Sequence, residues 1–544
     1  MKGGDPPGEE TGYETGSPRQ IRRATAAMVA GTALSRITGV ARMFALAYAL
    51  GFTSLADAYN LANTMPNIVH DLVIGGVLAA TFVPVFVDRL VRRPREEAWE
   101  AISAVTSVAL LVLAAASLVF LAAAPWVVDA VTVLIHGEHA RLQRAVATEL
   151  LRLFVPQLAA YGFISIATAL LNTTRRFAAP TFVPVVNNLV LIAMLVSFGT
   201  VVHGPTLASI QAHRTELVVL GLGTTLGVVL QGLLLIPSLR RAGLELRWLP
   251  SFRHEAVRTV VRLSGWTLGF VLANQVALMV VLALAERVGP GALSSYTYAY
   301  TVFLLPYGVM AVSVMSAVTP ELAAHWARDD VRLFRRRLAT GLRSILAIIL
   351  PAAAGEIVLA RPLVAFIFGH GAGSIASTLP TAHALAMLAL GLPGFCAFLY
   401  AVRVLQAIQD TRSAFWLYLL ENLLNIVGAV ILAGLLGLEG ITLSISIAYT
   451  IAAIVAFAHL RSKGHGLDLS YVARPALRVV VATAALVVVA AVTSNLSGSQ
   501  SALGLLGRVL LGVAGGAAAY ALVATAGALI SSRRRAGLHL MRRN

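Results

Sequence analysis

Two arginines, Arg36 and Arg42, lie inside the first long apolar segment of the chain, in the stretch SRITGVAR at 35–42. An arginine at the centre of a membrane helix costs about 2.5–3.5 kcal/mol on insertion scales, so each side chain should face protein or water rather than lipid. The planar guanidinium group matches the geometry of phosphate oxygens. We therefore predict that Arg36 and Arg42 bind the anionic part of a substrate.

The spacing of the two arginines limits how they act together. Six residues of α-helix separate two side chains by about 9 Å along the axis and by about 120° around it, so both cannot share one face of a straight helix. A bend at Gly39 would let both reach one extended anion, such as a pyrophosphate. In the structural alternative, one arginine forms an ion pair with Asp57 or extends to the membrane interface.

Asp57 stands at the start of the second apolar segment. An acidic side chain in a first turn satisfies free backbone N–H groups, so one prediction is that Asp57 caps that helix. The other, equally weighted, makes Asp57 a gating partner for an arginine.

The middle of the same segment is interrupted by Pro66-Asn67 and Gly75-Gly76. Free backbone groups at that depth are tolerated only beside protein or a wet cavity. Asn67, Gly75 and Gly76 are therefore predicted to form a hinge or a cavity wall rather than a passive kink. His70, which precedes Asp71, either titrates or forms an internally satisfied pair.

Two later apolar segments carry further polar side chains, namely Asn274-Gln275 and the group Glu421, Asn422 and Asn425. Such oxygen-rich groups could hold a sodium ion or relay a proton, so Asn274, Glu421 and Asn425 are candidates for ion coupling. Hydrogen bonding between helices is the alternative. No P-loop and no metal-ligand spacing occurs, so we predict no cofactor.

The elements that position these residues are predicted to be membrane helices. Of 544 residues, 58% are hydrophobic and 12% are charged, with a mean hydropathy of +0.81. Apolar stretches long enough to cross a bilayer recur from Ala24 to Ile530. The prediction is an all-α, polytopic membrane protein with about fourteen transmembrane helices, at 25–51, 54–88, 98–124, 146–171, 180–202, 216–238, 256–286, 291–320, 333–360, 379–407, 412–436, 440–461, 474–494 and 503–531.

Most of the 42 lysine and arginine residues fall in connections on one side of these helices. The positive-inside rule makes that side cytoplasmic and places both termini inside. The net charge of +17 is therefore a signal of topology and of attraction to anionic membrane lipids, not of nucleic-acid binding.

Similar segments recur about 236 residues apart, which indicates an internal repeat. Arg176, in a turn followed by Asn187-Asn188, parallels Asp410 and Arg412, in a turn followed by Asn422. An even number of spans separates the copies, so the two lobes are parallel. The predicted domains are a cytoplasmic tail at 1–20, six-helix lobes at 21–240 and 241–465, two extra helices at 466–531 and a basic tail at 532–544.

Together these motifs resemble the MurJ/MviN lipid II flippases of the multidrug/oligosaccharidyl-lipid/polysaccharide exporter superfamily. The matching blocks run in the family's order over residues 20 to about 530, and they are S35-R36-x-x-G39-x-x-R42, A56-D57-A58, P66-N67, G76 to P84, N172 to N187 and Q409-D410-T411-R412.

The resemblance implies two lobes around a cationic cavity that opens alternately to each side of the membrane. The substrate would be lipid II or a related polyprenyl-pyrophosphate glycan, and the last two helices would form a groove for its tail. The family's arginines map to Arg36 and Arg42, and its functional acid maps to Asp57. The chain would be a transporter and not an enzyme, with Na⁺, H⁺ or the membrane potential as driving force and with cell-wall synthesis or division proteins as partners.

Four residues depart from the pattern that the resemblance implies. Met43 replaces an acid, His70 and Asp71 replace an arginine pair, and Thr301 replaces an arginine. These changes make the expected cavity less cationic. They leave open a flippase for another polyprenyl-linked glycan, a drug or cation antiporter, or a scaffold of cell-wall synthesis that transports nothing.

Overall fold

A computed structural model describes residues 18–72, 94–173, 176–242, 246–263, 265–465, 469–495 and 501–541, and these residues form helices and connections without any strand. In chain order the elements are α1 (Pro18–Leu50), α2 (Ser54–His70), α4 (Arg95–Val131), α5 (Glu138–Thr173), α6 (Ala178–Val201), α7 (Leu207–Ala212), α8 (Arg214–Leu233), α9 (Ile236–Arg241), α10 (Glu255–Leu263), α11 (Gly265–Val288), α12 (Ala292–Pro306), η2 (Tyr307–Ala311), α13 (Val312–Ala327), α14 (Val331–Phe368), η3 (Ala376–Thr378), α15 (Leu379–Ala407), α16 (Thr411–Leu460), η4 (Arg461–His465), α17 (Leu469–Asn495) and α18 (Ala502–Met541).

The predicted all-α membrane fold is confirmed. Within the described residues, 12 helical segments are long and apolar enough to cross a membrane. One of them, Thr411–Gly464, turns sharply at Gly437, whose φ of 58° favours glycine, so it comprises two helices. With α2, which is shorter, the total is about fourteen, and the turn lies where the sequence predicts a connection.

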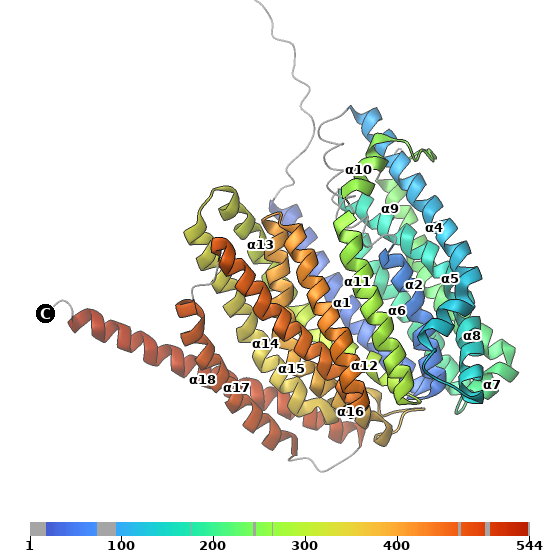
Figure 1. The fold of residues 1–544 in the computed structure, drawn as a ribbon. Helices are drawn as coiled ribbons and strands as arrows, with labels where there is room; N and C mark the ends of the chain where they lie inside the picture. The colour runs from blue at the N-terminus through green and yellow to red at the C-terminus, as the bar shows by residue number, and fades with distance from the viewer. Residues whose placement is uncertain are drawn as a thin grey trace, which may run out of the picture.

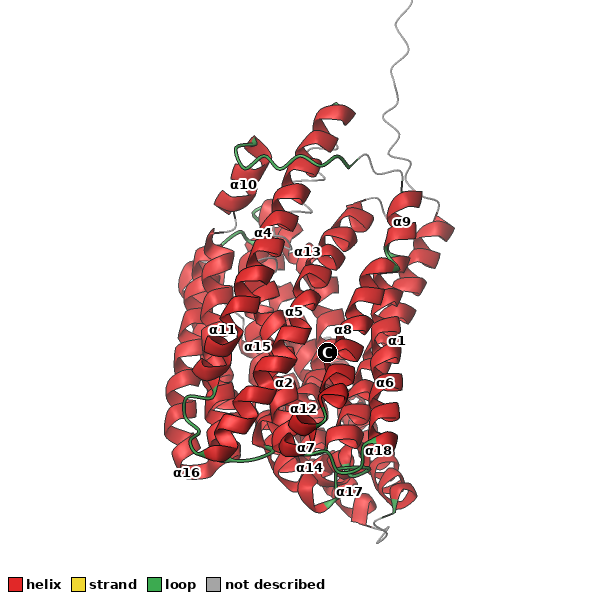
Figure 2. Cartoon of the chain, turned by 90° about the vertical axis from the view of Figure 1, so that its right-hand side faces the viewer, coloured by secondary structure: helices red, strands yellow, loops and turns green. Residues whose placement is uncertain are grey.

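The helices form two lobes with the same internal packing. In the first lobe α1 packs on α6, while α5 packs on α2, α4 and α8. In the second lobe α11 packs on α16, while α15 packs on α12, α14 and the remainder of α16. Figure 1 shows the two sets of helices side by side, and Figure 2 shows that the long helices of both sets run between the same two ends of the molecule.

The repeated turn predicted from the sequence is also present. The backbone N–H of Arg176 donates to the carbonyl of Leu171, and that of Asp410 donates to the carbonyl of Leu405, both at 2.8 Å. Each bond reaches back five residues and ends the preceding helix in the same way. Arg176 and Asp410 therefore occupy equivalent positions in the two lobes.

One element differs from the prediction. The helix expected at 291–320 contains a π-helical turn, η2, at Tyr307–Ala311, directly after Pro306. Proline has no backbone N–H and disturbs the hydrogen-bond ladder, and a π-turn accommodates such a disturbance.

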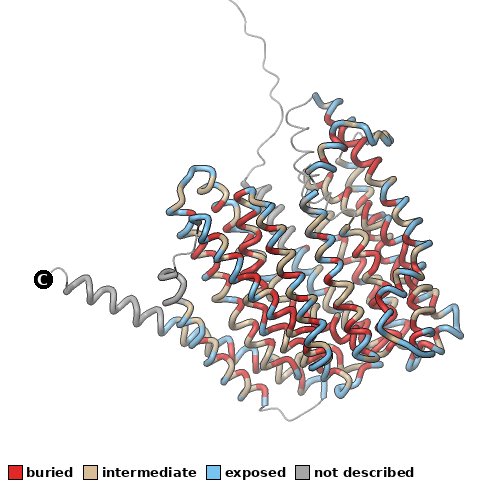
Figure 3. Tube along the Cα trace, viewed as in Figure 1, coloured by how far each residue is buried: buried red, intermediate tan, exposed pale blue. Residues whose placement is uncertain are grey.

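The C-terminal helices α17 and α18 pack on one another and on α14, outside the lobes. They lie along one flank in Figure 1, and Figure 3 shows that they are less buried than the helices of the lobes. The limits predicted for the lobes and the tails stay predictions.

Two terms describe the ends of the molecule. The sealed end carries the connections at 51–53, 289–291 and 369–375, and the opposite, basic end is where α1, α14 and α17 begin.

Candidate functional site

At the sealed end, Asp57 of the first lobe caps a helix of the second lobe. One carboxylate oxygen accepts hydrogen bonds from the backbone N–H and the hydroxyl of Ser294, at 2.8 and 2.7 Å, and the other accepts from the backbone N–H of Gly291, at 2.5 Å. These donors belong to the start of α12, where free N–H groups attract an anion. Asp57 is buried, so the lobes are tied by charge-assisted bonds shielded from water.

This arrangement corrects both predictions for Asp57. Its own helix, α2, is capped by Thr53, whose hydroxyl accepts from Ala56, and no arginine of the described residues pairs with Asp57. Asp57 is a cap, but of a helix in the other lobe.

Other contacts close the same end. The side-chain amide of Asn60 donates to the hydroxyl of Ser294 at 3.1 Å, and the backbone N–H of Ala372 donates to the carbonyl of Tyr48 at 2.9 Å. The amide of Gln143 on α5 donates to Glu286 on α11 at 2.7 Å. Three further inter-lobe bonds thus add to the Asp57 cap.

One cavity, of about 350 Å³, lies between the lobes. Another, of about 450 Å³, lies between α14, α17 and α18. This inter-lobe cavity is lined from α2, α11, α12 and α16, and its polar lining residues include Asn67, Asp71, Asn274, Gln275, Thr301, Glu421, Asn422 and Asn425. The predicted polar residues of three separate segments therefore meet at one place. Thr301, at the position where the resemblance implies an arginine, also lines this cavity.

The acids of the inter-lobe cavity differ in their surroundings. Asp71 accepts a hydrogen bond from Gln275 of the other lobe at 3.3 Å. Glu421 is buried, and one of its carboxylate oxygens has no partner. Asn425 accepts from Ser444 at 3.0 Å, as the hydrogen-bonding alternative predicts. Asn274 has no hydrogen bond to any of the residues that the structure describes. Among the described residues no three histidine, cysteine or acidic side chains cluster as metal ligands do.

The remaining candidates of α2 are satisfied within their surroundings. Asn67 donates to the carbonyl of Asn63 at 2.9 Å. The His70 ring contacts the hydroxyl of Ser165 at 2.9 Å and the carboxylate of Asp71 at 3.2 Å. These contacts agree with the alternative in which His70 and Asp71 form an internally satisfied pair. Gly75 and Gly76 lie outside the described residues.

Arg36 is exposed and reaches from α1 to the second lobe. Its guanidinium carbon lies 3.3 Å from the point where a Cβ atom of residue 308 would stand, so the absence of a side chain at Gly308 makes room for it. Gly308 belongs to the turn η2. Within the described part of the chain Arg36 has neither an ion pair nor a hydrogen bond, which leaves its charge free for a ligand.

Arg42 is half-buried and turns toward its own lobe. Its charge acts on the hydroxyl groups of Tyr59 and Tyr161, and no ion pair or hydrogen bond engages it among the described residues. The two arginines thus lie on different faces, and α1 runs through Gly39 as one helix without a break. Neither arginine lines the inter-lobe cavity.

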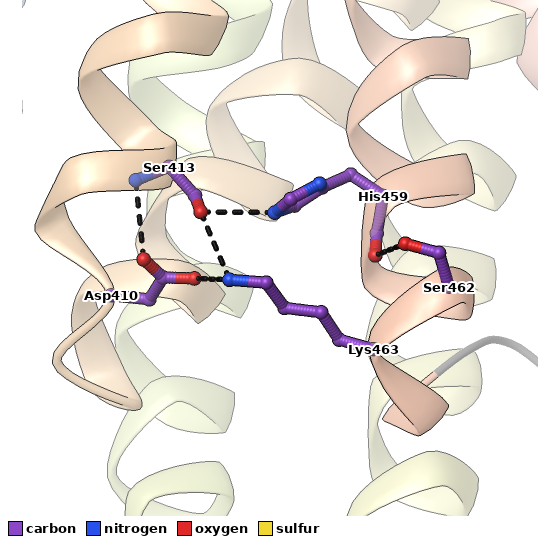
Figure 4. Close-up of polar contacts among 5 residues, drawn as sticks. All are labelled: Asp410, Ser413, His459, Ser462 and Lys463. Carbon is purple, nitrogen blue, oxygen red and sulfur yellow. Dashed lines mark hydrogen bonds and ion pairs between the residues drawn. The ribbon is translucent and has the colours of Figure 1, made fainter.

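The turn motifs lie at the basic end and have structural partners. Asp410 caps α16 by accepting from the backbone N–H of Ser413 at 3.1 Å, and it forms an ion pair with Lys463 (Figure 4). Burial raises the pKa of Asp410, but the hydrogen bonds from Lys463 and Ser413 outweigh it and leave the pKa below its ordinary value. Arg176 and Arg412 are exposed.

Sequence reasoning missed Gly291, Ser294 and Gly308. A glycine followed three residues later by serine before an apolar run is a weak signal for a helix start, and it does not reveal which acid reaches it. Gly308, directly after the pattern Leu305-Pro306-Tyr307, carries no local signal for an arginine contact.

The comparisons with known proteins agree with this geometry. The family model described as "Lipid II flippase MurJ" matches residues 46–529, which is most of the chain. The chain belongs to the MurJ family. The lipid II flippase MurJ of Burkholderia cenocepacia is 27% identical over 437 residues, covering 80% of this chain and 82% of that protein. The probable lipid II flippase MurJ of Rhizobium meliloti is 27% identical, covering 84% of each chain.

Solved structures show the same fold. A lipid II flippase MurJ in an inward closed conformation superposes with a TM-score of 0.73 at 21% identity, covering 92% of this chain and 98% of that one. An inward-facing multidrug resistance MATE family transporter of the MOP superfamily gives 0.63 at 16% identity, covering 79% and 94%. The MurJ fold therefore extends over nearly the whole chain.

Proposed function

We propose that this member of the MurJ family flips lipid II from the cytoplasmic to the outer leaflet of a bacterial membrane by alternating access. The observation that carries the proposal is the free guanidinium of Arg36, which projects from one lobe onto η2 of the other, while Asp57 ties the lobes at the sealed end. Membership of the family and the names of the relatives support lipid II as the substrate.

The obstacle to flipping is the head group, because its sugars, peptide and pyrophosphate strongly resist transfer into hydrocarbon. An arginine at 4 Å from a phosphate contributes up to about 4 kcal/mol per charge pair at an effective dielectric constant of 20, offset by desolvation. In this proposal Arg36 receives the pyrophosphate, and Arg42 follows it six residues later in the same helix. The buried carboxylate of Glu421, one oxygen of which has no partner among the described residues, favours a coupling cation in the inter-lobe cavity, either Na⁺ or H⁺.

The orientation follows from charge. We propose that the basic end faces the cytoplasm with both termini inside, since arginine-rich connections remain on that side. A reporter enzyme active only in the cytoplasm, fused after residue 544, should be active, and an inactive fusion would reverse the orientation.

The apolar cavity between α14, α17 and α18, about 450 Å³, is proposed to hold the polyprenyl tail while the head group crosses. Its lining is apolar except for Glu356 and Tyr520, and the Tyr520 hydroxyl donates to the carbonyl of Ala347 at 2.6 Å. This cavity is called the tail groove below.

The test is depletion of the native protein with complementation by Arg36→Ala. Lipid II should accumulate in the inner leaflet, inaccessible to a modifying enzyme added from outside, although the variant inserts normally. Arg240→Ala removes an exposed arginine of α9, at the basic end of the molecule, and should complement fully. Full complementation by Arg36→Ala would refute the proposed role of Arg36, and undiminished lipid II export without the protein would refute the function.

Membrane potential is the proposed driving force. Two negative charges that move outward across 100 mV gain roughly 4–5 kcal/mol, at about 2.3 kcal/mol per charge. Collapsing the potential with an ionophore should therefore stop the export of lipid II. Unchanged export at zero potential would exclude this source of energy.

A further inference from the structure

A third cavity, of about 410 Å³, adjoins the tail groove at the sealed end. Its lining comes from the same helices α14, α17 and α18, together with the connection before α15 and the first turn of α15. Its polar lining groups are Arg361, Thr378, Ser494, Asn495 and Arg508. It is called the arginine pocket below, and it brings two positive charges to the end of an otherwise apolar groove.

On α14 and on α18, residues that lie close together in the chain line the two cavities. On α14, Leu359 and Leu363 line the tail groove and Arg361 lines the arginine pocket. On α18, Val509 lines the groove and Arg508 lines the pocket. The two spaces therefore follow one another along the same helices.

Arg361 is held in place by a chain of polar contacts. Its guanidinium contacts Nε2 of His383 at 3.2 Å, and Nδ1 of His383 contacts the carboxylate of Glu439 at 2.7 Å. The carboxylate requires a proton on Nδ1, so Nε2 of a neutral ring is the acceptor for Arg361. Three helices thus fix the orientation of this arginine.

The tail groove also touches the element that meets Arg36. Met310 of η2 lines the groove, and Gly308 of the same turn contacts Arg36. One five-residue turn therefore borders both the first arginine of the proposed substrate path and the groove that ends at Arg361 and Arg508.

We propose that the arginine pocket binds the pyrophosphate of a polyprenyl-linked lipid in the leaflet at the sealed end, while its isoprenoid chain lies in the tail groove. This inference rests on the proposed function and assigns the place where the flipped lipid is held before release. An apolar chain joined to an anionic head matches an apolar groove that ends in two arginines. The arginine pocket lies between the second lobe and the outer helices α17 and α18, so none of the residues that make the inter-lobe contact of Asp57 lines it.

The test uses the full chain in nanodiscs of neutral phosphatidylcholine, with undecaprenyl pyrophosphate as the probe and native mass spectrometry as the readout. Replacing both arginines, Arg361→Gln with Arg508→Gln, should weaken retention of the probe about tenfold or more, since two charge-assisted contacts are lost. Arg214→Gln, at an exposed arginine of α8 at the sealed end, should leave retention unchanged. The double variant Arg361→Lys with Arg508→Lys keeps both charges, so it should retain more probe than the glutamine pair.

A second variant tests the chain separately from the head. A Cβ atom at Gly355, which lines the tail groove, would meet no atom within 4 Å, so Gly355→Leu fills the groove without a backbone clash. It should weaken retention of the probe but not of free inorganic pyrophosphate. Gly434→Leu, at an equally open glycine in α16, should change neither.

The possible results separate the sources of the anion. Retention of the probe that is unchanged in the glutamine pair would overturn the inference. Phosphatidylglycerol that competes as well as the probe would overturn the choice of a polyprenyl lipid, and free pyrophosphate that binds equally tightly would overturn the role of the groove. Because binding is measured without transport, these outcomes are independent of whether Arg36→Ala blocks flipping.

Discussion

The carboxylate of Asp57 on α2 accepts two hydrogen bonds from Ser294 at the first turn of α12, although the two residues are 237 positions apart and belong to different lobes. A helix N-terminus carries partial positive charge, and Asp57 supplies the anion that its own lobe does not need, since Thr53 already caps α2. An alternating-access transporter must break this contact each time the sealed end opens. Asp57 is therefore a reversible tie between the lobes.

Asp57→Asn should shift the protein toward the state that is open at the sealed end. The loss of a charged acceptor costs about 1.5–3 kcal/mol, which corresponds to roughly a ten- to hundredfold change in the population ratio. Spin labels at His203 and Ser374, exposed residues of the two lobes at the sealed end, should report longer distances after Cys396→Ala removes the native thiol. Asp330→Asn is the matched control, because Asp330 caps α14 within its own lobe. An unchanged distance distribution in Asp57→Asn would exclude the tie.

The sequence predicts the helices because apolar length alone decides which segments cross a membrane. The repeat is visible for a related reason, since both lobes keep the same turn at Arg176 and Asp410. Residues that face the inter-lobe cavity were found as polar groups in apolar segments, and Asn67, Asn274 and Glu421 do meet there.

The partners of these residues could not be predicted. Asp57 and Ser294 each resemble the start of an ordinary helix, and only the docking of the lobes brings them together. Likewise, Gly308 accommodates Arg36 through the π-turn, which depends on how α12 bends after Pro306. Contacts between lobes arise from tertiary packing, and local sequence patterns carry no information about that packing.

Asp410 should make the stability of the second lobe depend on acid. Its pKa lies below the ordinary value in the folded protein, so the stabilisation is present above the unfolded pKa of about 3.9 and is lost as the pH falls through the folded pKa. Asp410→Asn should therefore lower the melting temperature at pH 7, with a difference that shrinks as the pH falls below the unfolded pKa of about 3.9. Asp329→Asn is the control, because Asp329 is exposed and its φ of 56° suits asparagine. A difference in melting temperature that does not shrink as the pH falls below this value would show that the ion pair with Lys463 is not its source.

Gly308→Ala should impair transport through Arg36. The new Cβ atom would lie 3.3 Å from the guanidinium carbon, closer than ordinary contact, so the arginine must move. Arg36→Lys in the same background should lessen the effect, because an ammonium group is more compact than the guanidinium. The two changes should thus be non-additive in a double-mutant cycle of transport rates. Gly434→Ala, at a glycine with open space, should transport normally, and strict additivity would contradict the contact.

Glu421→Gln should remove the dependence of transport on a cation gradient. Glu421 is buried in the inter-lobe cavity, and one of its carboxylate oxygens has no partner among the described residues, so it can bind Na⁺ or a proton. Glutamine keeps the size of the side chain but not its charge. Loss of about 1.4 kcal/mol of cation binding corresponds to a tenfold weaker ion dependence. Transport in proteoliposomes, measured with an imposed Na⁺ or pH gradient, should respond to one of the two gradients in the native protein and to neither in the variant. Glu100→Gln, at an exposed acid of α4, serves as the control and should behave as the native protein. If Glu421→Gln keeps the full response, the carboxylate acts only in hydrogen bonding between helices, and the coupling cation must bind elsewhere.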